Sequence, residues 1–345
     1  MRARDLGIVL GDLPPGPLNA ITDVAGVRVG HATLVEGEAV RTGVTMVLPT
    51  DDGSPCFAGS YRLNGNGELT GLEWVRESGL LTTPIGITNT FSVGVVRDAI
   101  VSSEHDAGRG RWHLPVVGET YDGLLNEIEG MHVEAAHAHA AIDSASGGAV
   151  AEGAVGGGTG MICHGFKGGI GTASRATEVG TAGVLVQANH GRRPRLSIDG
   201  VPVGRELGPE RIPLPPWPDT GSGSIIVVVA TDAPLLPHQC DRLAARAALG
   251  IARTGGAGEN SSGDLLIAFA TGNRIDGDAR EPLAVEMLPN ERIDPLFYAA
   301  IEATEEAIVN ALVAAETMTG RAGAVVHRLD HDALVEVMQR FRPAR

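Results

Sequence analysis

Short apolar runs recur along the chain, and each is bounded by Gly, Pro, Asn or Asp. They are rich in β-branched residues, which is typical of buried strands. The runs predicted as strands are residues 43–48, 85–90, 114–117, 183–188, 225–230 and 265–270.

Longer patterns with helical spacing separate some of these runs. Residues 237–253 are predicted to form one helix. A second begins after Asp294, with Pro295 at a first-turn position, and continues to about residue 318. A third covers residues 333–341. Strands and helices mixed in this way indicate sheets covered by helices.

Two stretches are too polar, or too rich in Gly and Pro, to predict regular structure. Residues 191–223 are expected to run over the surface as a long loop. Residues 146–171 contain eleven glycines. Such a density indicates either tight turns or backbone that packs closely against something, and the two interpretations stay open.

Composition narrows the function classes. Aromatic residues make up only 3%, so the core is expected to consist of Val, Ile, Leu and Ala. The net charge of −15, without a long basic run, argues against nucleic-acid binding. No apolar run has the roughly 18 residues that a membrane span needs. Cys56, Cys163 and Cys240 are widely spaced, which fits neither disulfides nor a zinc site, so a cytoplasmic location is expected.

Several common catalytic and binding patterns are missing. Lys167 lacks the Ser or Thr that a phosphate-binding loop needs, and Gly158 does not begin a dinucleotide-binding pattern. His132, His137 and His139 match no metalloprotease spacing and are interpreted as structural. The serine-hydrolase pattern around Ser224 precedes a strand, which is the wrong context. We therefore expect no cofactor and no metal.

The segment around Ser262 carries the most informative signal. A polar, Gly-rich turn leads to Ser262 and Gly263-Asp264, and an apolar strand follows at once. One interpretation is ordinary turn chemistry. The other is that the Ser262 hydroxyl attacks the carbonyl of Ser261 and cuts the chain there. The freed α-amine of Ser262, with an ordinary pKa of about 7.7–8.0, then serves as the base for its own hydroxyl.

The sequence resembles the L-aminopeptidase/D-esterase family, which includes the β-peptidyl aminopeptidases and consists of self-cleaving N-terminal-nucleophile hydrolases. The resemblance extends over nearly the whole chain and rests on seven segments in order. These are Pro17-Leu-Asn-Ala-Ile-Thr-Asp-Val-Ala-Gly-Val-Arg-Val-Gly-His, Leu63-Asn-Gly-Asn-Gly-Glu-Leu-Thr-Gly, Thr88-Asn-Thr-Phe-Ser-Val-Gly, Gly118-Glu-Thr-Tyr-Asp-Gly, Val184-Leu-Val-Gln-Ala-Asn, Ala230-Thr-Asp-Ala-Pro-Leu and Asn260-Ser-Ser-Gly-Asp.

This resemblance implies an α+β fold, a four-layer αββα sandwich of the type shared with ornithine acetyltransferases. It implies one catalytic domain, 1–345, that is processed into a large chain (1–261) and a small chain (262–345). It also implies a homo-oligomer, a tetramer of these heterodimers, and a small peptide or amide as substrate.

The same resemblance implies roles for individual residues. Ser262 is the nucleophile. Thr304 and Glu306 match a hydroxyl and an acid near its amine, and Asn189 and Tyr121 match the donors of the oxyanion hole. The remaining two matches are Glu119, for the carboxylate that holds the substrate's free amine, and Trp112, for a nearby aromatic wall.

One departure from the family pattern concerns the cleavage site. Ser261 stands where the family is associated with Gly, which predicts slower cleavage and raises Ser261 as a competing nucleophile. The expected function is an autoproteolytic serine aminopeptidase that releases a small N-terminal residue. Two alternatives remain, an acyltransferase of the ornithine acetyltransferase type and an uncleaved small-molecule binding protein.

Overall fold

The larger of two central sheets holds the strand that begins at Ser262. The structure, a computed structural model, describes residues 1–108, 112–216 and 223–341. The six strands pair in the order β4-β3-β12-β11-β10-β9. Their bounds are β3 Cys56–Gly65, β4 Leu80–Leu81, β9 Gly169–Thr177, β10 Gly180–Asn189, β11 Gly223–Thr231 and β12 Ser262–Ala270. β11 and β12 are parallel, and the other neighbouring pairs are antiparallel.

The second sheet has four strands in the order β1-β2-β5-β6. Their bounds are β1 Arg28–Glu36, β2 Val40–Leu48, β5 Ile85–Asn89 and β6 Val116–Thr120. Two further ladders are short hairpins, β7 Ile162–Cys163 with β8 Phe166–Lys167, and β13 Met318–Thr319 with β14 Val325–Val326.

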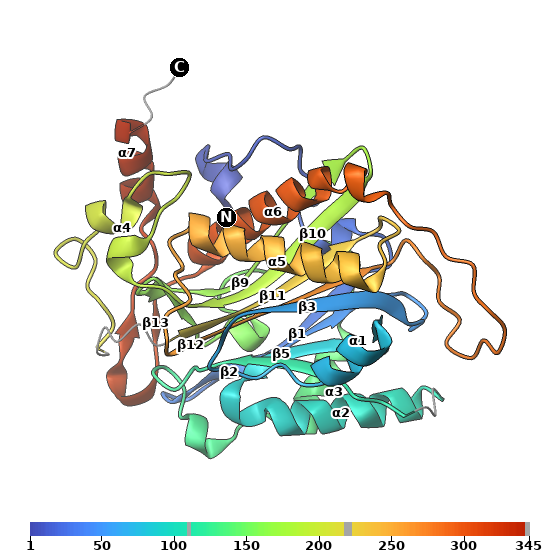
Figure 1. Cartoon of the computed structure of the whole chain (residues 1–345). Coiled ribbons are helices and arrows are strands. Elements are labelled where there is room, and N and C mark those ends of the chain that lie inside the picture. Colours follow the sequence, from blue (N-terminus) through green and yellow to red (C-terminus); the bar gives the residue numbers. More distant parts are fainter. Residues whose placement is uncertain (109–111, 217–222, 342–345) are drawn as a thin grey trace.

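Helices cover the outer faces of both sheets, so four layers stack as α, β, β, α (Figure 1). α5 and α6 lie on the larger sheet, and α2 and α3 lie on the smaller one. The helices are α1 Leu72–Ser78, α2 Val93–Asp106, α3 Ala135–Asp143, α4 Val203–Glu206, α5 Pro237–Arg253, α6 Asp294–Ala314 and α7 His331–Phe341. The predicted α+β, four-layer αββα sandwich is confirmed.

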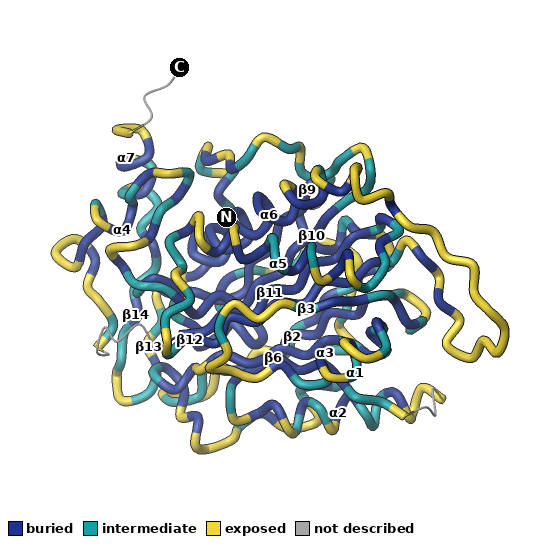
Figure 2. Tube along the Cα trace, in the orientation of Figure 1, coloured by how far each residue is buried: buried dark blue, intermediate teal, exposed yellow. Residues whose placement is uncertain are grey.

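Three apolar layers lie between the four structural layers. They form because successive side chains of a strand point to opposite faces of its sheet. Ile226 and Val228 of β11 point between the sheets, whereas Ile225 and Val227 point toward α5 and α6. A strand buried on both faces reads as a continuous apolar run, which is how β11 appears in the sequence. Figure 2 shows the inner strands buried along their length.

Most sequence-predicted elements are present. All six predicted strands are found, and α5 has the predicted bounds. α6 ends at Ala314, four residues before the predicted end, and α7 begins at His331, two residues before its predicted start. The glycine-rich stretch 146–171 is not without regular structure, because the hairpin of β7 and β8 lies within it.

The fold also places the three histidines and the expected loop. His132 precedes α3, whereas His137 and His139 lie within it. The expected loop 191–223 is largely irregular where it is described, and Trp217, Pro218 and Gly221-Ser222 lie outside the described residues.

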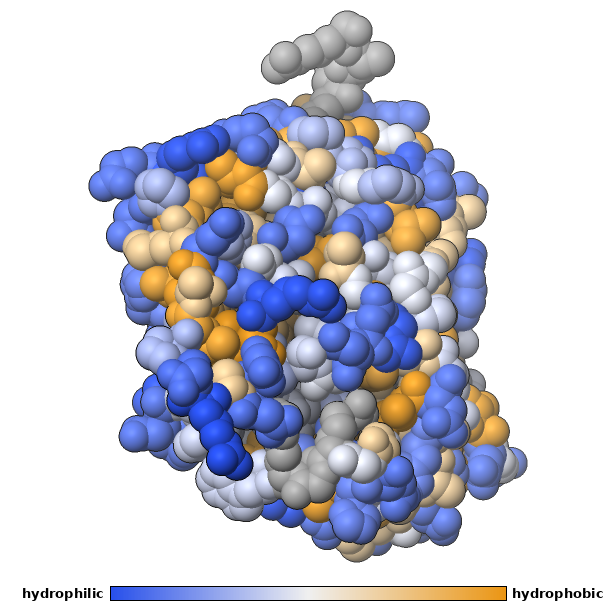
Figure 3. Space-filling model, turned by 90° about the vertical axis from the view of Figure 1, so that its right-hand side faces the viewer, coloured by the Kyte–Doolittle hydropathy of each residue, from blue (hydrophilic) through white to orange (hydrophobic). Residues whose placement is uncertain are grey.

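Among the described residues, no helix combines the length and the apolar character needed to cross a membrane. On the face shown in Figure 3, hydrophobic residues occur in groups among hydrophilic ones. The expected oligomer and the expected cytoplasmic location stay predictions.

Candidate active site

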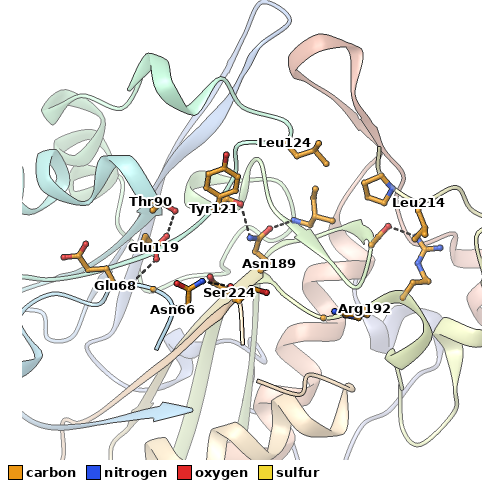
Figure 4. A pocket seen from close by; sticks show the side chains of 18 residues that line it. Asn66, Glu68, Thr90, Glu119, Tyr121, Leu124, Asn189, Arg192, Leu214 and Ser224 are labelled. Carbon is orange, nitrogen blue, oxygen red and sulfur yellow. Dashed lines mark hydrogen bonds between the residues drawn. The ribbon is translucent and has the colours of Figure 1, made fainter. Parts of the chain in front are cut away.

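A cavity of about 570 Å³ opens where strand ends of the larger sheet meet (Figure 4). β10 ends at Asn189, and β11 and β12 begin at Gly223 and Ser262. Strand pairing sets Ser224 opposite Asn189 and Gly223 beside Ser262. The topology therefore collects residues that are far apart in the sequence at one edge of the sheet.

The smaller sheet supplies the opposite wall of the cavity. Glu119 lies in β6, Tyr121 follows the end of that strand, and Thr90 follows β5. β5 and β6 are parallel, with Asn89 beside Thr120, so their carboxyl ends meet at the same edge. The site thus forms between the ends of two stacked sheets.

The peptide bond between Ser261 and Ser262 is held from several sides. Ser261 lines the cavity, and the side-chain amide of Asn66 donates a hydrogen bond of 2.8 Å to its carbonyl oxygen. The amide of Asn64 donates to the carbonyls of Ser262 (2.5 Å) and Glu259 (2.6 Å). The scissile carbonyl predicted from the sequence is therefore already hydrogen-bonded to a side-chain N–H.

The hydroxyl of Ser262 faces a carboxylate on its own strand. Residues two apart on a strand point to the same side, and Ser262 Oγ donates a hydrogen bond of 2.5 Å to Asp264 Oδ1. Burial raises the pKa of Asp264, although the hydrogen bond from Ser262 opposes that shift. A buried carboxylate with a raised pKa, in contact with a hydroxyl, is suited to accept its proton.

Close packing requires a glycine at position 263, between these two residues. A Cβ at this position would lie 2.5 Å from the carbonyl oxygen of Asn66 and 2.7 Å from the Cα of Gly67. Only glycine allows the loop after β3 to come this close to the start of β12. That approach is what brings the Asn66 amide to the carbonyl of Ser261.

Glu119 is buried, and both of its carboxylate oxygens accept hydrogen bonds. Oε1 accepts from the backbone N–H of Glu68 at 3.0 Å, and Oε2 accepts from the hydroxyl of Thr90. Burial raises the pKa of Glu119, and these two donors oppose the shift. The carboxylate lines the cavity in a fixed orientation.

Asn189 is fixed by its neighbours and lines the same cavity. Its Oδ1 accepts from the backbone N–H of Ile162 at 2.7 Å, and its Nδ2 donates to the carbonyl of Tyr121 at 3.0 Å. An amide nitrogen carries two hydrogens, so one more remains for a ligand oxygen. The ring of Tyr121 extends away from Asn66 in Figure 4 and lies over Gly123.

The structure separates Thr304 and Glu306 from the cavity, which corrects the roles expected for them. Thr304 is buried in α6 against Gly250 of α5, and its hydroxyl donates to the carbonyl of Ala300 at 2.7 Å. Glu306 lies on another side of α6. The near-opposite directions of residues two apart on a helix explain why the two side chains do not meet.

Glu306 belongs to a buried cluster of charges. Its carboxylate accepts from Arg175 at 2.7 Å, from Arg4 at 2.8 Å and from the amide of Asn19 at 2.6 Å. Burial alone would raise the pKa of Glu306, but the hydrogen bond from Arg4 and the charge of Arg175 outweigh it and lower the pKa. This carboxylate ties the N-terminal segment to α6 and β9.

Trp112 is also outside the cavity. Its side chain is 67% exposed and makes an edge-on ring contact of 5.0 Å with Trp74 of α1. The expectation that it walls the amine site is therefore wrong for this chain. Sequence reasoning also missed Asn64, Asn66 and Asp264, although all three lie in segments that carry the family resemblance.

Comparisons with known proteins identify the family of this chain. The sequence pattern of Peptidase family S58 matches residues 19–326. The chain belongs to this family. It is 50% identical to beta-peptidyl aminopeptidase BapA of Sphingosinicella microcystinivorans, across 99% of this chain and 92% of that protein. The suspected family and the hydrolase class are thereby confirmed.

Solved structures of family members match over the whole fold. A beta-aminopeptidase from Burkholderia sp. superimposes with a TM-score of 0.93 at 54% identity, covering 100% of both chains. The L-aminopeptidase D-Ala-esterase/amidase of Ochrobactrum anthropi, described as a variant of the Ntn hydrolase fold, gives 0.91 at 44% identity and covers 99% of this chain and 98% of that one.

Proposed function

We propose that this S58 aminopeptidase matures by cutting itself between Ser261 and Ser262, and then removes small N-terminal residues through an acyl-enzyme on Ser262. The observation that carries the proposal is the surroundings of one peptide bond. Its carbonyl accepts from Asn66, the attacking hydroxyl donates to Asp264, and the bond lies at the wall of a cavity.

Self-cleavage begins in the intact chain, where Ser262 has no free amine to serve as a base. Oγ of Ser262 adds to the carbonyl carbon of Ser261 while its proton passes to Asp264. The C–N bond then breaks, and the leaving amine takes up a proton. Water hydrolyses the resulting ester, which leaves the carboxylate of Ser261 and restores the Ser262 hydroxyl. The Asn66 amide stabilises the oxyanion, and such a donor contributes about 3–4 kcal/mol.

In the mature enzyme, the new α-amine takes over as the base. Its ordinary pKa of about 7.7–8.0 leaves part of it neutral at pH 7. Asn189 and Tyr121 are proposed to donate to the substrate oxyanion. Burial, followed by the charge of Glu129, raises the pKa of Tyr121, so its hydroxyl stays protonated and able to donate.

The substrate is anchored by its free amine. Glu119 presents a buried carboxylate to the cavity, and pairing it with an ammonium gives a charge-assisted hydrogen bond. This restricts substrates to peptides, amides and esters with a free N-terminus. Relatives described as beta-peptidyl aminopeptidases support extending the substrate range to an N-terminal β-amino acid.

The test compares β-alanyl and L-alanyl p-nitroanilides with their N-acetylated forms. Free-amine substrates should be hydrolysed, and the acetylated forms should be turned over at least a hundredfold more slowly. Added hydroxylamine should trap the acyl group as a hydroxamate. Equal turnover of free and acetylated substrates would contradict amine anchoring. Transfer to an amine acceptor without hydrolysis would favour the acyltransferase alternative.

A further inference from the structure

Behind the proposed oxyanion donor lies a cluster of side chains that the mechanism does not use. The N–H of Ile162 donates to the side chain of Asn189, and the N–H of His164 donates to the carbonyl of His190 at 2.7 Å. These bonds tie the hairpin of β7 and β8 to the segment that follows β10. The adjacent residues Cys163 and His164 therefore meet His190, which lies 26 positions after His164 in the sequence.

All three side chains are buried, and their ligand atoms converge. One Cys sulfur and one nitrogen from each His lie within 4.8 Å of one another. Cys163 Sγ and His190 Nδ1 are 3.9 Å apart, and the two imidazole rings meet edge-on with centroids 5.2 Å apart. A tetrahedral zinc ion with bonds of about 2.3 Å to sulfur and about 2.1 Å to nitrogen separates those atoms by about 3.6 Å.

The hydrogen bonding of the histidines leaves nitrogen atoms without partners. Nε2 of His164 is buried and has no hydrogen-bond partner among the described residues, whereas His190 turns its Nδ1 toward Cys163 Sγ. His164 Nδ1 lies 3.1 Å from the carbonyl oxygen of Arg192, which only accepts, so Nδ1 carries the proton and Nε2 carries a lone pair. An N–H to carbonyl bond at the far nitrogen is the arrangement that orients a metal-binding histidine.

The backbone also favours access to this cluster from the cavity. His164 and Gly165 both have positive φ, as a two-residue hairpin turn requires, and His164 takes the position where Asn or Gly is usual. Gly191 lines the cavity and lies directly against the His164 ring, since a Cβ there would be 2.3 Å from ring carbon Cε1. The backbone of Gly191 therefore lies between the His164 ring and the cavity.

We propose that Cys163, His164 and His190 form a zinc site with an open fourth position, behind the oxyanion donor Asn189. One thiolate and two imidazoles are soft to intermediate ligands that suit Zn²⁺, and the set contains no carboxylate that would favour Mg²⁺ or Ca²⁺. On binding, the thiol loses its proton to solvent, which reduces the net charge that the buried ion adds. Cysteine spacing gave no sign of this site, because its ligands come from a hairpin turn and a strand end.

The test uses the full, untagged chain after treatment with a chelator. Zn²⁺ should bind at one ion per chain, and Co²⁺ should give the thiolate-to-cobalt absorption band of a sulfur-bound ion. Zn²⁺ should also raise the Tm. Mg²⁺ should neither bind at this site nor raise the Tm.

Cys163→Ser should abolish the cobalt band and the zinc-dependent rise in Tm. The matched control, Cys240→Ser, changes another buried cysteine, outside the cluster, and should keep both. His164→Phe provides a second loss-of-binding variant should Cys163→Ser fail to fold. The proposal is overturned if the wild-type chain gives no thiolate-to-cobalt band, or if zinc binding survives His164→Phe unchanged.

Discussion

Replacing Asp264 by Asn removes the proposed base of self-cleavage while preserving the shape of the side chain. The hydroxyl of Ser262 donates to this carboxylate at 2.5 Å, and an amide in its place is not basic enough to take the proton. General-base catalysis contributes about 10²–10⁴-fold, which corresponds to about 3–5 kcal/mol of activation free energy. Asp264→Asn should therefore process at least a hundredfold more slowly than the wild type.

The assay follows newly synthesised chain in a cell-free reaction, sampled over time on a denaturing gel. Asp232→Asn is the matched control. That carboxylate lies just after β11, at the opposite end of this strand from the cavity, and accepts a hydrogen bond from the N–H of Thr181. It should process at the wild-type rate.

The pH dependence supplies a second readout of the same base. Because the pKa of Asp264 is raised, the fraction able to accept a proton falls as the pH drops through that raised value. Wild-type processing should slow in the same direction and reach a plateau at higher pH. Processing of Asp264→Asn at the wild-type rate, or equal slowing of Asp232→Asn, would refute the assignment.

Two further substitutions separate binding from folding. Glu119→Gln should raise the KM for free-amine substrates about 10–100-fold, because the charged hydrogen bond to the substrate ammonium, about 1.5–3 kcal/mol, is lost. Processing should stay intact, and steady-state kinetics measures the change in KM. Glu306→Gln should lower the free energy of unfolding by about 3–5 kcal/mol without a matching loss of kcat, because it breaks a buried pair with Arg175; denaturant titration checks this. The pKa of Glu306 is lower in the folded protein than its ordinary value of about 4.3. The stabilisation by this carboxylate is therefore fully present above that ordinary value and is lost as the pH falls through the pKa of the folded state. The difference in unfolding free energy between Glu306→Gln and the wild type should accordingly shrink in acid.

Local pattern predicted the parts of the fold that have a strong period. β11 and β12 are buried on both faces and so appear as unbroken apolar runs, and α5 is amphipathic with Pro237 at its first turn. β1, β3 and β9 were missed. β1 and β3 leave exposed residues where they extend beyond the packed layers, and β9 is rich in Gly, Ala, Ser and Thr.

The site was predictable only in part, for a physical reason. Ser262, Asn189 and Glu119 come from strand ends; Asn189 and Glu119 line one cavity, and Ser262 follows the lining residue Ser261, while their catalytic roles stay predictions. α6 is buried almost throughout, so it has no separate polar and apolar faces. Its sequence therefore does not distinguish a catalytic acid from a structural one. Glu306 could be recognised as structural only from its contacts with Arg4 and Arg175, which are distant in the sequence.

The most direct measurement of the central claim is the intact mass of the purified protein, together with that of Ser262→Ala. The account predicts two chains, residues 1–261 and 262–345, with Ser262 as the new N-terminus, and a single chain for Ser262→Ala. An uncut wild-type chain, a cut at another bond, or a Ser262→Ala protein that still splits at the same bond would contradict it.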